Sequence, residues 1–167
     1  PQDLIFNKTY KNKELFFEKI ELKGVSYKYP GSTKVVINNV NFTINNGESI
    51  GIIGRTGSGK STLINLIMGL IKPKCGEINF ADKGRNITKS FVSQKITMLR
   101  RSVRDNLCFP LKIEGKKENF IEDRVQYFLK KFDITDLAQR SARKLSSGKK
   151  QYISIIRSLT LDSKILI

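Results

Sequence analysis

One stretch of the sequence is rich in glycine and reads Gly54-Arg55-Thr56-Gly57-Ser58-Gly59-Lys60-Ser61-Thr62. It matches G-x-x-x-x-G-K-[ST], a pattern in which each fixed residue has a physical task. The glycines let the backbone curl until successive N–H groups face inward toward a phosphate. A helix that follows would offer its first N–H groups and the positive end of its dipole to the same anion. The stretch therefore predicts a phosphate-binding loop.

Two side chains of this loop carry further chemistry. Lys60 is placed to reach the β- and γ-phosphates of a nucleotide, and Ser61 to offer its hydroxyl to Mg²⁺. The flanks fit this expectation, because the short apolar run Ser49–Ile53 predicts a strand that leads into the loop. Apolar residues then recur at helical spacing, at Leu63, Ile64, Leu66, Ile67 and Leu70, and Pro73 ends the pattern. The structural alternative is a loop that only joins a strand to a helix.

Outward from the loop, short apolar runs are typical of strands, at residues 20–22, 25–29, 35–42, 77–80, 88–93 and 164–167. Residues 1–17 are polar and irregular, which indicates a lead-in or linker. From about residue 103 the pattern becomes helical. One stripe is formed by Phe120, Ile121, Val125, Phe128, Leu129 and Phe132, and a last helix at 147–161 has Tyr152, Ile153, Ile155, Ile156 and Leu159 on its expected buried side. Both stripes are expected to be core.

The composition is that of an ordinary globular domain apart from a net charge of +16. This charge suits nucleic acid or an anionic membrane surface, but the basic residues are scattered, and we favour a solvated surface instead. No apolar run approaches the roughly 20 residues that a membrane helix needs. Cys75 and Cys108 are too few and too far apart for a disulfide framework or a metal site.

The residues around the loop resemble the ABC-type ATPases, and the resemblance covers nearly everything from Ile20 to Ile167. Upstream, Gly24-Val25-Ser26-Tyr27-Lys28-Tyr29-Pro30-Gly31 is similar to the segment that carries this family's adenine-stacking aromatic. By register that residue is Tyr29, with Tyr27 as the other candidate. A flat aromatic face against a purine is physically reasonable, and the alternative is an ordinary half-buried strand tyrosine.

Two downstream segments extend the resemblance. Phe91-Val92-Ser93-Gln94 is similar to the family's glutamine loop, which implies that Gln94 contacts Mg²⁺ or the attacking water. Leu145-Ser146-Ser147-Gly148-Lys149-Lys150-Gln151 resembles the signature motif L-S-G-G-Q, which contacts the γ-phosphate bound on a second subunit. Ser146 and Gly148 suit that task, whereas Ser147 replaces a glycine and Lys149 replaces a glutamine. These two departures put efficient turnover in doubt.

The end of the sequence departs furthest from the family pattern. Ile165-Leu166-Ile167 matches the apolar part of the Walker B strand, which in the family continues to an Asp for Mg²⁺ and a Glu that polarises water. Those two residues and the family's later switch histidine are absent from the 167 residues. We therefore expect that these residues are a fragment that binds ATP but does not hydrolyse it appreciably.

The implied fold class is α/β: a P-loop NTPase with an ABC-type ATPase core, in which a mainly parallel sheet carries the loop. An N-terminal antiparallel β-subdomain and a helical subdomain at about 103–143 complete the domain, which spans 18–167. The resemblance implies ATP and Mg²⁺ as ligands. It also implies a second ATP-binding domain, the same or different, and transmembrane permease subunits or domains as partners, at the cytoplasmic face of the cell membrane. ATP-driven closure of the two domains would then power transport.

Three alternatives remain open at this point. The lead-in and the loop sequence resemble domains fused behind an exporter's membrane helices, whereas the segments 98–107 and 110–115 resemble importer subunits, most of all oxyanion (tungstate-type) ones. We favour the importer type. ABC-type ATPases that act on DNA or ribosomes share the motifs, but they usually separate them by long insertions, so nucleic acid is not a favoured partner. A small-molecule kinase would need neither the signature helix nor the upstream aromatic.

Overall fold

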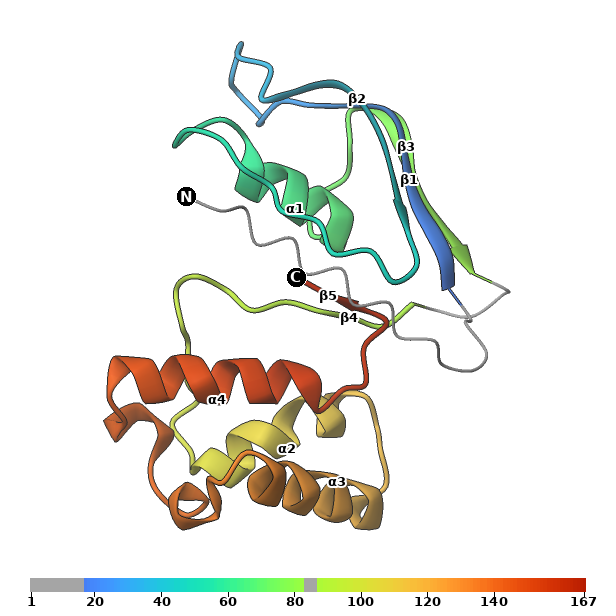
Figure 1. Cartoon of the computed structure of the whole chain (residues 1–167). Helices are drawn as coiled ribbons and strands as arrows, with labels where there is room; N and C mark the ends of the chain where they lie inside the picture. Colours follow the sequence, from blue (N-terminus) through green and yellow to red (C-terminus); the bar gives the residue numbers. More distant parts are fainter. Residues whose placement is uncertain (1–16, 83–86) are drawn as a thin grey trace, which may run out of the picture. The chain divides into compact units, whose positions relative to one another are not determined.

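Strand β1 (Phe17–Tyr27) is the middle strand of an antiparallel sheet in the first of two units, Pro1–Ile87 and Thr88–Ile167, into which the chain divides. The computed structural model describes residues 17–82 and 87–167. β2 (Ile37–Asn45) and β3 (Cys75–Asp82) flank β1 in the order β2-β1-β3 (Figure 1). This sheet is the antiparallel β-subdomain that the sequence predicts. Residues 1–16 of the predicted lead-in lie outside the described residues.

Buried residues alternate with less buried ones in the first part of β1, and this alternation shifts by one residue further along the strand. Ile20 and Leu22 are buried two residues apart, as expected for one face of a strand. Val25 is also fully buried, although it is three residues after Leu22. The pairing with β2 shifts register between these residues, and the pairing with β3 shifts between Lys23 and Ser26. Such a bulge moves the following side chains to the other face. The predicted runs 20–22 and 25–29 therefore contribute to one strand that ends at Tyr27.

The strand expected at Ser49–Ile53 is wrong. Among the described residues no strand pairs with this run, and its backbone belongs to no sheet. Ile53 is 94% exposed, and Ile50 and Ile52 are also exposed. The run therefore has neither a hydrogen-bonded neighbour nor a buried face, the two features that stabilise a strand. The parallel pairing that the structure does contain lies in the second unit.

Helix α1 (Lys60–Met68) follows the glycine-rich loop directly, as predicted. Its buried residues are Thr62, Leu66 and Ile67, which recur at helical spacing. The helix ends at Gly69, in the left-handed conformation, whose N–H bonds the carbonyls of Asn65 and Leu66. This glycine cap ends the helix earlier than the expected stop at Pro73.

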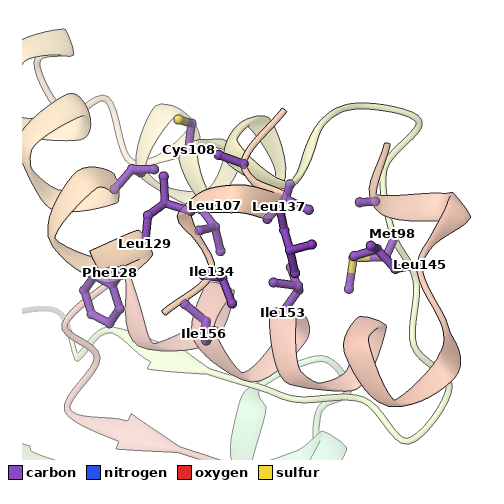
Figure 2. Close-up of a cluster of buried hydrophobic side chains, with 14 of the residues drawn as sticks. Met98, Leu107, Cys108, Phe128, Leu129, Ile134, Leu137, Leu145, Ile153 and Ile156 are labelled. Atoms are coloured by element: carbon purple, nitrogen blue, oxygen red, sulfur yellow. The ribbon is translucent and has the colours of Figure 1, made fainter. Parts of the chain in front are cut away.

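The second unit consists of three helices, two short 3-10 turns and a parallel strand pair. The helices are α2 (Val103–Ile113), α3 (Glu118–Lys131) and α4 (Ser147–Leu159), with the turns η1 (Thr135–Leu137) and η2 (Ala142–Lys144) between the last two. β4 (Lys89–Ser90) pairs in parallel with β5 (Ile165–Leu166). The helices enclose one cluster of buried apolar side chains that extends from Met98 to Ile156 (Figure 2). A helical segment was expected here.

The apolar residues predicted to be core are buried at the centre of each helical stripe, but some at the edges of the stripe are exposed. In α3 the residues from Ile121 to Leu129 at helical spacing are buried, whereas Phe120 is 49% exposed. In α4, Ile153 and Ile156 are fully buried, but Tyr152 and Ile155 are exposed. The small residues Ser154 and Ser158 occupy the buried face instead, and the Ser158 hydroxyl donates to the Ile155 carbonyl. A serine whose hydroxyl bonds a carbonyl of its own helix can lie in a core. Apolar residues alone therefore do not show where the buried face of this helix ends.

None of the helices in the described residues is long and apolar enough to cross a membrane.

Candidate functional site

The backbone of the loop 54–62 adopts conformations that require glycine. Gly57 has a φ of 79° and Gly59 a φ of 96°, both in the left-handed region that side chains disfavour. A Cβ on Gly59 would also lie 3.0 Å from the Val36 carbonyl oxygen and 3.0 Å from Ile37 Cδ1. The loop is therefore seated against the start of β2, and this contact leaves no room for a side chain.

Lys60 folds back across the loop to which it belongs. Its ammonium donates to the carbonyl oxygens of Gly54, at 2.7 Å, and of Arg55, at 2.9 Å. An ammonium has three donor hydrogens, so these two bonds leave it one more. The charge is thus held against the backbone of the loop itself.

The first turn of α1 completes the loop as a phosphate site. Its first intrahelical bond runs from the Leu63 N–H to the Gly59 carbonyl, at 2.9 Å, so the N–H groups of Lys60, Ser61 and Thr62 precede the helical ladder. No acidic residue lies in this turn to compete for them. The Ser61 side chain is exposed beside the loop. A polyphosphate with Mg²⁺ fits these groups, because Mg²⁺ prefers oxygen ligands and keeps several waters.

Tyr29 lies next to this loop in the same unit. Its hydroxyl is hydrogen-bonded to Thr62 Oγ1 at 2.9 Å, and its ring makes an edge contact with Tyr27, at 5.1 Å between centroids. Tyr29 is 43% exposed, whereas Tyr27 is 7% exposed. Of the two aromatic candidates, only Tyr29 presents a ring that a ligand can reach without a rearrangement of the sheet.

Gln94 belongs to the second unit and follows the parallel strand pair. The ladder of that pair continues past β4, because the Val92 N–H donates to the Ile167 carbonyl at 2.7 Å. Gln94 comes two residues later, and its side chain is exposed. The amide therefore stands just beyond a strand end, the position expected for a glutamine loop.

Ser146, also in the second unit, caps α4. Its hydroxyl accepts from the Lys149 N–H at 3.5 Å, and its carbonyl accepts from the Lys150 N–H at 2.9 Å. Ser147, Gly148 and Lys149 are exposed in the first turn. No acid lies in this turn, whereas the first turns of α2 and α3 contain Asp105 and Glu118. Lysines near a helix N-terminus carry the unfavourable sign for the helix dipole, and a bound anion would relieve this.

The buried residue Asn106 is a structural feature that the motifs do not indicate. Its side-chain oxygen accepts from the Leu99 N–H at 2.9 Å, and its amide donates to the Ser102 carbonyl at 2.8 Å. It thereby ties the segment after Gln94 to α2. A usable signal exists, because Asn106 interrupts the apolar face that contains Val103 and Leu107, and a polar residue there must find partners.

The described residues contain no group of three or more His, Cys, Asp or Glu that could hold a metal ion. The Mg²⁺ implied by the resemblance would instead be held by the Ser61 hydroxyl together with the phosphates, so its binding would depend on the nucleotide.

Comparisons with known proteins agree on one family. Residues 37–167 match the protein family described as "ABC transporter". The chain is 36% identical over 161 residues to the methionine import ATP-binding protein MetN of Carboxydothermus hydrogenoformans, covering 89% of this chain and 48% of the relative. It is 33% identical to the tungstate uptake system ATP-binding protein TupC of Peptoclostridium acidaminophilum, covering 89% of this chain and 70% of the relative.

Solved structures give the same result for the fold. One is cbiO1 from Clostridium perfringens, part of the ABC transporter complex cbiONQ, with a TM-score of 0.73 and 27% identity. The match covers 90% of this chain and 64% of that one. The predicted fold class, an ABC-type ATPase core, is thereby confirmed. The chain spans about half the length of the first curated relatives that it matches.

Proposed function

Because this chain belongs to the ABC transporter family of ATP-binding proteins, we propose that it binds MgATP through the loop 54–62 and that the complete protein couples ATP hydrolysis to transport. The observation that carries the proposal is the geometry of Lys60. Its ammonium is held over the loop by two of the loop's own carbonyls, next to the first N–H groups of α1. One loop thus carries a positive charge and backbone N–H donors that precede the helical ladder, and a polyphosphate requires both.

Each predicted site residue has a role within this proposal. Lys60 contacts the β- and γ-phosphates, the loop N–H groups surround them, and Tyr29 stacks on the adenine. Ser61 holds Mg²⁺, which neutralises phosphate charge when bound. Gln94 keeps the contact with Mg²⁺ or the attacking water that the family resemblance implies. The exposure of Ser61, Gln94 and the Tyr29 ring supports these roles, since each side chain is accessible to a ligand.

Ser146, Ser147, Gly148 and Lys149 are proposed to contact the γ-phosphate held by a second ATP-binding domain. The basic first turn of α4 supports this role, because an anion there would relieve the unfavourable charge at the helix N-terminus. Lys149 would add a charged contact that the glutamine of the family pattern does not provide. The partner proposed for this turn is therefore a second copy or a homologous domain. The family resemblance adds transmembrane permease subunits or domains, at the cytoplasmic face of the membrane.

Import is the favoured direction of transport. Two relatives described above are an import protein and an uptake protein, and they differ in their substrate, so tungstate is one among several possibilities. The second candidate function, action on DNA or ribosomes, is favoured only by the net charge of +16. Binding to nucleic acid that weakens steeply with salt would support that candidate. Co-purification with a polytopic membrane protein would support transport.

The first test is titration of the chain with MgATP, with Lys60→Met and Lys72→Met compared. Lys72 is an exposed lysine of the same unit, so it controls for the loss of one positive charge. We expect Lys60→Met to weaken MgATP binding about 10- to 100-fold, because hydrogen bonds to charged groups contribute roughly 1.5–3 kcal/mol. Lys72→Met should bind like the wild type. Equal losses in the two variants would contradict a specific role for the loop.

A further inference from the structure

We propose that Thr62 is a positioning residue for the nucleobase: its hydroxyl holds the Tyr29 ring where adenine stacks, and so couples base binding to the phosphate loop. The inference rests on the proposed function, since it concerns the same nucleotide site. It gives Thr62, the last residue of the loop 54–62, a coupling to the base that neither the loop pattern nor the family resemblance specifies.

The hydrogen bond between the two hydroxyls connects parts of the chain that are 33 residues apart. Tyr29 lies in the turn between β1 and β2, and Thr62 lies in the first turn of α1. Their hydroxyl oxygens are 2.9 Å apart, and either can be the donor. Thr62 is 5% exposed, so this helix-bound hydroxyl has little access to water. The ring is thereby attached directly to the helix whose N-terminus completes the phosphate site.

Tyr29 is held at a second point as well. Its ring meets the buried Tyr27 ring at an interplanar angle of 86°. An edge contact of this kind stabilises a fixed orientation of the two rings. Although it is held at both points, Tyr29 remains 43% exposed. A large aromatic that is fixed and still accessible is preorganised, because less side-chain freedom is lost when a ligand binds.

The identity of residue 62 fits the role. Threonine is branched at Cβ, which restricts the rotation of its side chain in a helix. Its Oγ1 is therefore held in place more firmly than a serine hydroxyl would be. The alternative is that the bond only braces the turn between β1 and β2. A brace would affect every ligand of the loop alike, whereas a positioning contact affects the part of the affinity that depends on the base.

The test compares MgATP with magnesium tripolyphosphate, which has the phosphates but no base or ribose. Titration calorimetry on the whole chain gives both affinities for the wild type, Tyr29→Phe, Thr62→Val and the double variant. We expect the ratio of the two affinities to fall about 3- to 10-fold in each single variant, the usual effect of losing one neutral hydrogen bond. The double variant should fall no further, because both substitutions remove the same bond. Thr62→Ser should keep most of the ratio.

Tyr127→Phe is the matched control. It removes the hydroxyl of another exposed tyrosine, in α3, which is bonded to Lys131 and is remote in sequence. Its ratio should equal that of the wild type. Thermal melting of every variant checks that each is folded.

Several results would overturn the inference. An unchanged ratio in Tyr29→Phe, or equal losses for both ligands, would show a brace, and additive losses in the double variant would show that the hydroxyls act separately. If the wild type binds MgATP no more tightly than tripolyphosphate, the base makes no contribution, and the inference fails although the phosphate loop stands. If the wild type binds neither ligand, the proposed function itself fails.

Discussion

The two units present their proposed nucleotide contacts on different kinds of scaffold. In the first unit the contacts are backbone N–H groups and the ammonium of Lys60, held in a loop whose glycines cannot be replaced without strain. In the second unit the contact turn is the N-terminus of α4, a helix whose Ile153 and Ile156 are fully buried in a continuous core. One site depends on backbone conformation, and the other depends on the stability of the helices beneath it.

The kind of scaffold determines which substitutions each site tolerates. A loop that works through its backbone needs particular residues at particular positions, so its pattern is strict. A helix cap needs one hydroxyl and a stable helix, and it tolerates changes elsewhere in its first turn. The chain shows this contrast, since the loop matches its pattern at every fixed position, whereas the turn at 145–151 departs at Ser147 and Lys149.

The largest change in the free energy of unfolding is expected from a substitution in the helical core of the second unit. Ile121→Ala removes a side chain that is 1% exposed in the core, and such changes cost about 2–5 kcal/mol because a cavity is left behind. Ile113→Ala is the matched control, since Ile113 is 70% exposed at the end of α2. Urea unfolding followed by circular dichroism measures both free energies of unfolding.

The thiol of Cys108 reports on the same unit. Cys108 is 3% exposed, and burial raises the pKa of its thiol, so it should react with a thiol reagent only when the helices open. The exposed Cys75 should react at once and serves as the internal reference. Faster labelling of Cys108 in Ile121→Ala than in Ile113→Ala is the expected result. Equal rates would show that the helical core is not what protects this thiol.

The next effect concerns the loop backbone. Gly59→Ala places a side chain at a left-handed φ and against Val36, which should cost about 1–2 kcal/mol and weaken MgATP binding. Gly51→Ala is the control, because a Cβ there meets nothing within 4 Å. It should be neutral or stabilising by about 0.4–1 kcal/mol, through the unfolded chain. Calorimetric titration and thermal melting of both variants separate binding from stability, and similar binding by both would refute the requirement for glycine.

Local rules decide how much could be predicted from the sequence, in both units. The loop, α1 and the helical unit were predictable because they follow local rules, namely glycine placement and helical periodicity. The bulge in β1 and the exposure of Ile53 were not, because they depend on which strands pair. The bond from Thr62 to Tyr29 was not predictable either, since it joins side chains 33 residues apart. The roles of Gln94 and Ser146 stay predictions.

A smaller effect compares two helix caps within the second unit. The Ser102 hydroxyl accepts from the Asp105 N–H at 3.0 Å and donates to the Asp105 carboxylate at 2.7 Å. The Ser146 hydroxyl accepts from the Lys149 N–H at only 3.5 Å. Ser102→Ala should therefore cost about 1–2 kcal/mol and Ser146→Ala about 0.5 kcal/mol, within the range for such caps. Urea unfolding of both variants decides the order. The reverse order would mean that Ser146 is needed mainly for the fold and would weaken its proposed role toward a phosphate.

The smallest effect concerns Glu48, in the turn between β2 and the loop of the first unit. Its carboxylate accepts from the side-chain amide of Asn45 at 3.0 Å and from the Asn45 N–H at 2.8 Å. These bonds, the side-chain bond first, lower the pKa of Glu48 below its ordinary value of about 4.5. A carboxylate with a lowered pKa stabilises the folded state above that ordinary value. The contribution is lost as the pH falls through the folded pKa.

Glu48→Gln should therefore be less stable than the wild type by a constant amount above about pH 4.5, with the difference closing at lower pH. Asn45→Ala should make the stability less dependent on pH, since it removes the side-chain hydrogen bond, the larger cause of the lowered pKa of Glu48. Urea unfolding in a pH series that crosses the ordinary value measures both variants. A stability difference that widens at low pH would contradict a lowered pKa of Glu48 in the folded state. The expected small size follows from the exposure of the pair, since water weakens contacts between exposed polar groups.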